Sequence, residues 1–152
     1  MAAPPPMSPA PGELLDLAVT AARAAGELLA EGLSRPTHVE LKTDRVSIVT
    51  WADIAAQSEI VRIITERYPD HLILAEEGPS HGGNGSVTWL VDPLDGTSNF
   101  IAGFPFWGVS IAAREGSQIV AGAVWWWHRR EARRAPALPT ESSDAAHMME
   151  GP

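Results

Sequence analysis

The feature that most constrains the fold is a short apolar run that ends in two aspartates. Residues 87–91 read Val-Thr-Trp-Leu-Val, which has the length and composition of a buried β-strand. Asp92 and Asp95 follow, and Gly96 and two hydroxyl residues come directly after them. A strand that delivers two carboxylates into a glycine turn can hold a hard cation.

Two amphipathic helices are predicted before this strand. From Gly12 onward, apolar residues recur at the spacing of a one-sided helical stripe, and the Arg35-Pro36 pair closes that segment. A second helix is indicated by residues 50–53, which have the pattern of a capping box, and by an apolar face that ends before Pro69. The two helices are expected to pack against each other.

Short apolar runs predict four strands. His71–Ala75 and Val87–Val91 are separated by a glycine-rich loop over residues 78–85. Residues 108–114 and 118–127 are predicted to form a hairpin. Two helices followed by four strands predict the α+β class, with layered helices and an antiparallel-rich sheet.

The composition excludes several classes of function. With 152 residues, of which 45% are hydrophobic, the chain is expected to form one domain. A net charge of −8 argues against a nucleic-acid partner, and the absence of cysteine excludes disulfides and thiolate-bound metals. Residues 1–11 are proline-rich and expected to be a disordered leader, with no secretory signal or membrane-spanning run. A cytoplasmic protein without a membrane partner is the resulting expectation.

The turn after the apolar strand suits magnesium and phosphate. Magnesium prefers oxygen ligands in near-octahedral geometry, and Asp92, Asp95 and one backbone carbonyl would provide them. Gly96 permits a tight backbone path. The amides of residues 96–98, if they open a helix, would bind a phosphate group.

Glu76 is a third carboxylate near this turn. It lies at the end of the preceding predicted strand, and pairing of the two strands could bring it beside Asp92. Three acids could hold two magnesium ions roughly 3.5–4 Å apart, which is the arrangement that promotes in-line phosphoryl displacement. The pattern D-x-x-D-G alone also fits an ordinary structural turn.

The longer segment resembles the D-P-[IL]-D-G-T-x-N-F signature of the inositol monophosphatase family, within the magnesium-dependent, lithium-sensitive sugar phosphatases. The matching residues are Asp92-Pro93-Leu94-Asp95-Gly96-Thr97-Ser98-Asn99-Phe100. The resemblance covers about residues 13 to 124. The supporting segments are Lys42, Val49-Thr50-x-x-Asp53, Tyr68-Pro69-x-His71, Glu76-Glu77-Gly78 and Gly103-Phe104-Pro105-Phe106. It implies the first half of an αβαβα sandwich.

The resemblance also implies a set of metal ligands. Glu76, Asp92 and the Leu94 carbonyl would bind a first Mg²⁺ ion, and Asp92 and Asp95 would contribute to a second. The substrate that it implies is a phosphate monoester of a small polyol or sugar.

Further roles follow from the same resemblance. Asp95, Gly96 and Thr97 would bind the substrate and its phosphate. Thr97, supported by Asp53, and Glu76 would position the attacking water. On the residues alone, Asp53 also fits a helix-capping acid and Thr97 a turn hydroxyl.

The chain departs from the family pattern after Val124. The family continues into a second half with a W-D-x-x-[AG]-G segment, which supplies another metal-binding aspartate and is absent here. Residues 12–127 are therefore expected to form a truncated domain of doubtful activity, and residues 128–152 a disordered or out-of-frame tail. The uncovered sheet is expected to favour a homodimer or aggregation.

Other enzyme classes share parts of this pattern. The haloacid dehalogenase pattern D-x-D-G-T has one residue fewer between its acids. Within the superfamily, histidinol phosphate, fructose bisphosphate or a nucleotide 3′-phosphate would be alternative substrates. An inactive remnant or pseudoenzyme is the non-enzyme alternative. No P-loop motif occurs.

Overall fold

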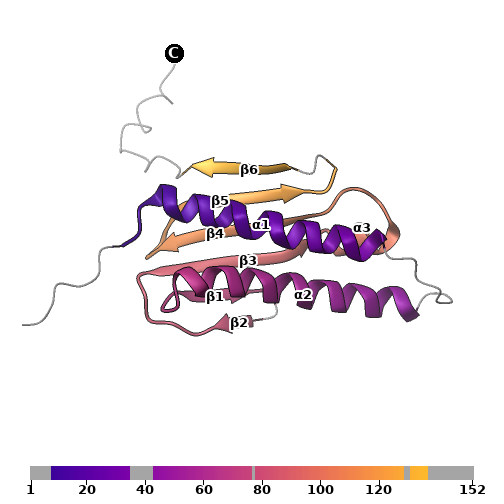
Figure 1. Ribbon diagram of the computed structural model, residues 1–152, viewed down its shortest axis with the longest axis horizontal. Coiled ribbons are helices and arrows are strands. Elements are labelled where there is room, and N and C mark those ends of the chain that lie inside the picture. Colours follow the sequence, from indigo (N-terminus) through magenta and orange to yellow (C-terminus); the bar gives the residue numbers. More distant parts are fainter. Residues whose placement is uncertain (1–7, 35–42, 77, 129–130, 137–152) are drawn as a thin grey trace, which may run out of the picture.

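The computed structural model describes residues 8–34, 43–76, 78–128 and 131–136. Two long helices lie side by side over one face of a six-stranded sheet (Figure 1). The helices are α1 (Pro11–Ser34), α2 (Thr43–Arg67) and α3 (Thr97–Ala102). The strands are β1 (Leu72–Ala75), β2 (Gly78–His81), β3 (Val87–Asp95), β4 (Gly108–Glu115), β5 (Gln118–Trp126) and β6 (Glu131–Pro136). This arrangement confirms the predicted α+β class.

The sheet has β3 near its centre. Its strand order is β2-β1-β3-β4-β5-β6. β1 and β3 run parallel, with Leu72 opposite Thr88 and Ala75 opposite Val91. The other neighbouring strands pair antiparallel, including β4 and β5, which form the predicted hairpin. Because β1 and β3 are parallel, their carboxyl ends lie at the same edge of the sheet.

The core lies between this sheet and the two long helices. Alternate residues of β3 point toward the helices, and Val87, Trp89 and Val91 are buried there. α2 buries residues spaced four apart, which form a single stripe along one face of the helix. They are Ala52, Ala56, Ile60 and Ile64. The opposite face of the sheet is not covered by α1 or α2 (Figure 1).

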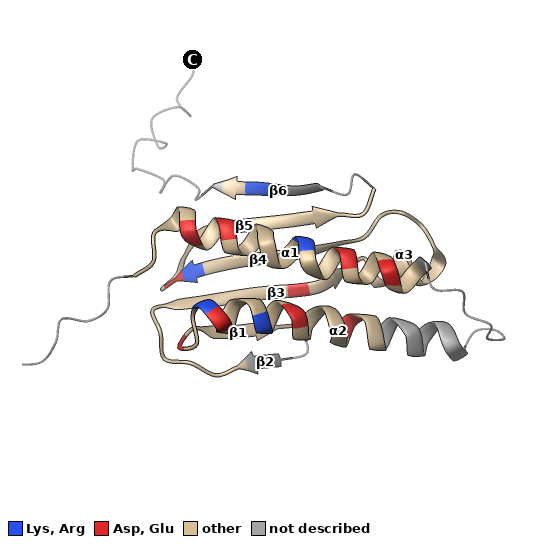
Figure 2. Ribbon diagram, in the orientation of Figure 1, with Lys and Arg blue, Asp and Glu red and all other residues tan. Residues whose placement is uncertain are grey.

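Charged residues recur along both long helices (Figure 2). Arg62 bonds Glu59 and Glu66 on the same face of α2, both at 2.7 Å. Arg134 of β6 bonds Asp16 of α1 at 2.8 Å. This last pair connects the first helix to the last strand across 118 positions of sequence.

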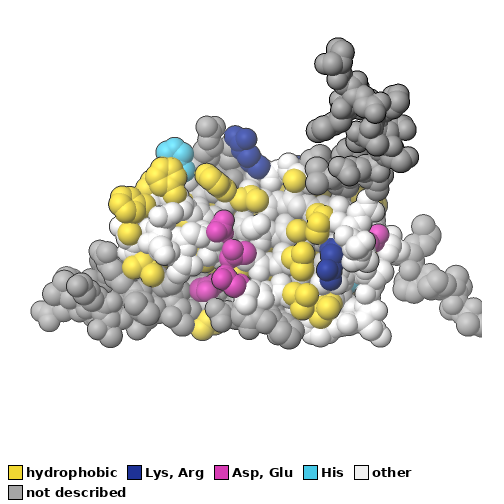
Figure 3. All heavy atoms as spheres, turned by 180° about the vertical axis from the view of Figure 1, so that it is seen from behind, with side chains coloured by type: hydrophobic (Ala, Val, Ile, Leu, Met, Phe, Trp, Pro, Cys, Tyr) yellow, Lys and Arg dark blue, Asp and Glu magenta, His cyan; other side chains and the backbone are white. Residues whose placement is uncertain are grey.

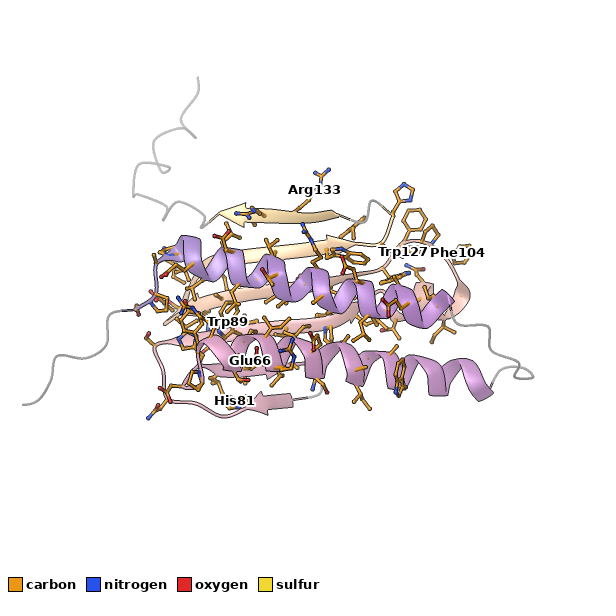
Figure 4. The ribbon with its side chains drawn as sticks, in the orientation of Figure 1. Glu66, His81, Trp89, Phe104, Trp127 and Arg133 are labelled. Carbon is orange, nitrogen blue, oxygen red and sulfur yellow. The ribbon has the colours of Figure 1, made fainter. Side chains whose placement is uncertain are left out.

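α1 packs closely on β5 because Gly26 leaves room for an indole ring. A Cβ atom at position 26 would overlap the ring of Trp125. Trp125 belongs to an aromatic cluster in which its ring centroid lies 5.8 Å from that of Trp107 and 6.4 Å from that of Trp127. Phe100 of α3 meets Trp107 edge-on at 4.9 Å. The cluster packs α1, α3 and β5 together, and Figure 4 labels Trp127 at this end of the sheet.

A buried hydrogen bond joins the residue before β1 to β3. Trp89 Nε1 donates a hydrogen bond to His71 Nδ1 at 3.0 Å, and the His71 ring stacks on Tyr68 with centroids 4.4 Å apart. An indole nitrogen is only a donor, so His71 Nδ1 must be the acceptor and carries no proton. The bond therefore requires the neutral imidazole.

The start of α2 differs from the prediction. The helix begins at Thr43, so residues 50–53 lie in its interior rather than at its cap. A four-residue capping pattern does not exclude earlier helical turns, which is why it misplaced the boundary. Trp51 of α2 is 51% exposed, whereas Trp89 and Trp107 are buried.

The structure also differs at both ends of the predicted domain. Pro11 opens α1 rather than ending a disordered leader, a position that suits proline because the first helical amide needs no partner. β6 lies within the predicted disordered tail, where pairing with β5 satisfies its backbone. β2 replaces part of the predicted loop. Residues 1–7 and 137–152 lie outside the described residues.

None of the helices in the described ranges is long and apolar enough to cross a membrane.

We predict that Gly26→Ala destabilises the protein although alanine is the better helix former. Overlap with Trp125 should lower the free energy of unfolding by about 1–3 kcal/mol. Gly32→Ala in the same helix is the matched control, because a Cβ atom there meets only Trp51, at an ordinary 3.9 Å. The control should gain about 0.5–1 kcal/mol. Urea unfolding of both variants checks this, and equal effects would contradict the packing.

We also predict a loss of stability in mild acid that depends on His71. Burial lowers the pKa of His71 below its ordinary value of about 6.5, while the nearby charges of Asp70 and Glu115 oppose this. As the pH falls, the His71 imidazole is therefore protonated at a higher pH in the unfolded chain than in the folded protein. The stability present above about pH 6.5 is lost as the pH falls from there toward the folded pKa.

His71→Asn, which keeps an acceptor near the Nδ1 position, should flatten the pH dependence of the free energy of unfolding between pH 7 and pH 5. His81→Asn is the control and should retain the wild-type slope. An unchanged slope in His71→Asn would show that another group is responsible.

Candidate metal centre

The end of β3 brings the signature residues to the uncovered face of the sheet. Asp92 follows Leu90 on that face and is partly buried, whereas Asp95 is exposed. Pairing with β4 is regular up to Asp92 and shifts between Asp92 and Asp95. Within this irregular turn the Leu94 amide donates to Asp92 Oδ1 at 3.2 Å, which fixes the carboxylate.

The turn continues through Gly96 into α3. Gly96 has a left-handed backbone with φ of 85°, and a Cβ atom there would lie 2.7 Å from the Phe106 carbonyl oxygen. Both facts require glycine at this position. The Thr97 hydroxyl donates to the Leu94 carbonyl oxygen at 3.1 Å. α3 starts at Thr97, so its first amides lie outside the intrahelical hydrogen-bond ladder, as the predicted phosphate site requires.

The loop after α3 is held against the turn. Asn99 Nδ2 donates to the Phe106 carbonyl oxygen at 2.8 Å. Gly103, with φ of 75°, ends α3, and its amide bonds the Phe100 carbonyl oxygen at 3.2 Å. No role for Asn99 follows from the sequence pattern alone. Its place in the signature was the signal that could have found this contact.

Three nearby carboxylates, from separate parts of the chain, affect the pKa of Asp92. The pKa of Asp92 is raised first by burial and then by the nearby negative charges of Glu76, Asp95 and Asp53, while the bond from the Leu94 amide opposes the rise. Glu76 comes directly after β1, whose last residue lies beside Val91 of β3. Figure 3 shows acidic side chains gathered on the face opposite α1 and α2.

The structure thus brings most of the predicted site residues together. Asp92, Glu76 and Asp95 lie close enough to interact, and Asp53 approaches from the interior of α2 rather than from its cap. Lys42 and Glu77 lie outside the residues that can be described. In the described ranges, no three carboxylate or imidazole side chains stand close enough to surround one ion by themselves.

The residues fit magnesium by chemistry. The donors are carboxylate and carbonyl oxygens, and a partly buried carboxylate crowded by like charges is stabilised when a cation neutralises it. Magnesium usually takes one or two protein carboxylates and completes its shell with waters and substrate phosphate. A closed ring of protein ligands is therefore not required.

The chain is an α+β protein with two long helices on a mixed sheet. Its carboxylates gather at the end of the central strand, where they form a candidate metal site with oxygen ligands. A family model described as the inositol monophosphatase family matches residues 11–133. The chain belongs to the inositol monophosphatase family.

Curated relatives agree with this assignment. The Nus factor SuhB of Haemophilus influenzae is 40% identical over 114 residues, which are 74% of this chain and 43% of that protein. Human inositol monophosphatase 1 is 38% identical over 117 residues, which are 74% of this chain and 42% of that protein. The chain therefore spans less than half the length of these relatives.

Solved structures share the fold. The extragenic suppressor protein SuhB of Bartonella henselae matches with a TM-score of 0.70 and 30% identity, over 82% of this chain and 48% of that one. The inositol monophosphatase of Anabaena matches with a TM-score of 0.67 and 31% identity, over 82% of this chain and 44% of that one. These matches confirm the predicted family and fold.

We predict that Asp92→Asn raises the unfolding temperature in magnesium-free buffer, because it removes the charge that burial and its neighbours disfavour. The same change should abolish stabilisation by magnesium. For the wild type we expect about 2.7 kcal/mol at a magnesium concentration of 100 times Kd. Glu31→Gln, which removes an exposed charge from α1, is the control for net charge. Equal magnesium stabilisation of both variants would exclude Asp92 as a ligand.

Proposed function

We propose that this chain supplies the metal-binding and phosphate-binding half of a magnesium-dependent phosphomonoesterase, acting on a phosphate ester of a small polyol or sugar. The observation that carries the proposal is the gathering of four carboxylates beside the turn into α3. Family membership supports the substrate class. The acidic cluster supports the reaction class.

The metal would be held by side-chain and backbone oxygens of the turn. Glu76, Asp92 and the Leu94 carbonyl suit one ion, and Asp92 with Asp95 suits a second. Among the described residues, Asp92 Oδ1 accepts one hydrogen bond, from the Leu94 amide, which leaves a lone pair for a ligand. Bound magnesium would stabilise charge on the phosphoryl oxygens and lower the pKa of a coordinated water.

The phosphate would be received at the start of α3. The left-handed conformation of Gly96 turns the backbone sharply, and the amides of residues 97–99 lie outside the helical ladder. The Thr97 hydroxyl donates its proton to the Leu94 carbonyl oxygen, so its own oxygen remains an acceptor. Glu76 and the Thr97 oxygen would accept hydrogen bonds from the attacking water and so orient it toward phosphorus, and Asp53 would support Thr97.

The test is phosphate release from inositol 1-phosphate by the purified chain with magnesium. We expect release that requires magnesium and falls on the order of a hundredfold in Asp92→Asn, because the metal contributes several kcal/mol of transition-state stabilisation. Glu31→Gln should match the wild type. If the folded wild-type chain releases no more phosphate than Asp92→Asn, the chain does not catalyse this reaction.

A further inference from the structure

A pocket of about 270 Å³ lies where α2 leads into β1, beside the start of β3. Its walls come from residues 8–9, 67–71 and 85–86. Ser86 directly precedes β3, so about 20 Å of extended strand separates it from Asp92. Figure 4 labels Trp89 toward this end of the sheet and Trp127 toward the other. The pocket is therefore distinct from the candidate metal centre.

His71 presents a hydrogen-bond donor to this pocket. The residue is 7% exposed, and its Nδ1 atom accepts the bond from Trp89, so the ring proton is on Nε2. None of the described residues accepts a hydrogen bond from Nε2. The adjoining ring atom, Cδ2, faces Gly85, where a Cβ atom would approach it to 3.1 Å, and Gly85 also lines the pocket. A buried donor without an acceptor costs free energy, which an acceptor on a ligand would recover.

Among the described residues that line the pocket, one is cationic and one is anionic. Burial lowers the pKa of His71, and the charges of Asp70 and Glu115 oppose this, so both carboxylates lie near the imidazole. Of these two, Asp70 lines the pocket. Arg67 lines it as well, and its guanidinium is 3.7 Å from the Glu13 carboxylate, beyond hydrogen-bond distance. This contact leaves the N–H donors of Arg67 open to a ligand.

A pair of hydroxyl groups adds a further donor to the wall of the pocket. Ser8 Oγ and Ser86 Oγ are 2.7 Å apart, and either atom can be the donor. Because one hydroxyl donates to the other, the proton of the second hydroxyl is left for a ligand. Pockets for drug-sized ligands have volumes of about 300–1,000 Å³, so this smaller pocket suits a ligand of few heavy atoms.

We propose that this pocket binds a small zwitterion of the chemical class of the free α-amino acids. The ligand carboxylate accepts hydrogen bonds from His71 Nε2 and from the serine hydroxyl pair and faces Arg67, and the ligand ammonium group faces Asp70. A ligand with a single charge is repelled by one of these two side chains, whereas a zwitterion is attracted by both. The site does not depend on the proposed phosphatase activity, because it shares no residue with the candidate metal centre.

Titration of the ¹⁵N-labelled full chain with L-alanine tests the proposal, observed through the imidazole nitrogens of His71 by NMR. We expect a Kd on the order of millimolar, with a shift of Nε2 and slower exchange of its proton. Propionate lacks the ammonium group of alanine and ethylamine lacks its carboxylate, and both should bind about tenfold more weakly. No shift with alanine well above this concentration, or equal affinities for alanine and propionate, would overturn the proposal.

Charge variants separate recognition from a general effect on the fold. Asp70→Asn should weaken the binding of alanine and strengthen that of propionate, each by roughly fivefold, because it removes the negative charge alone. Arg67→Gln should weaken the binding of both probes. Arg23→Gln, on the exposed side of α1, is the matched control and should change neither. The hydrogen bond from Trp89 to His71 Nδ1, observed in the same spectra, reports that each variant is folded. Equal loss of both probes in Asp70→Asn would overturn the pairing of charges.

Discussion

The alternation of side chains along β3 is the constraint on which the rest of the structure depends. One set of residues, including Trp89, enters the core beneath the helices, and the other set, ending in Asp92, faces the uncovered side. The strand lies between β1, its parallel neighbour, and β4, its antiparallel neighbour. A shift of one residue would bury Asp92 among apolar side chains and expel Trp89. Core packing therefore fixes the position of the carboxylate.

Local sequence patterns predicted an element correctly where its structure depends mainly on residues close in sequence. The stripe of α1 and the length of β3 predicted those elements within a few residues. Asp92 and Asp95 share one turn, so their proximity followed directly. β6 could not be foreseen, because Glu-Ala-Arg-Arg-Ala-Pro has weak strand propensity and its strand conformation depends on pairing with β5.

The approach of Asp53 to Asp92 is a tertiary property. Nothing in the local sequence around Asp53 distinguishes an acid that faces a site from one that caps a helix, and only the resemblance suggested its role. Glu76 was closer to prediction, because acids that follow neighbouring parallel strands meet at one edge of the sheet. Burial is a tertiary property as well, because Trp51 has apolar neighbours in sequence and is nevertheless exposed.

The contact between α1 and β5 has a consequence for biosynthesis. Gly26 must meet Trp125, and Asp16 must meet Arg134, so the first helix finds its partners about 100 residues later. At ribosomal rates of about 5–20 residues per second, the part of its apolar face that packs on β5 stays uncovered by that strand for roughly 5–20 s. During that interval the nascent chain exposes the surface that chaperones recognise. The fold is therefore completed after translation of β6, rather than element by element as the strands emerge.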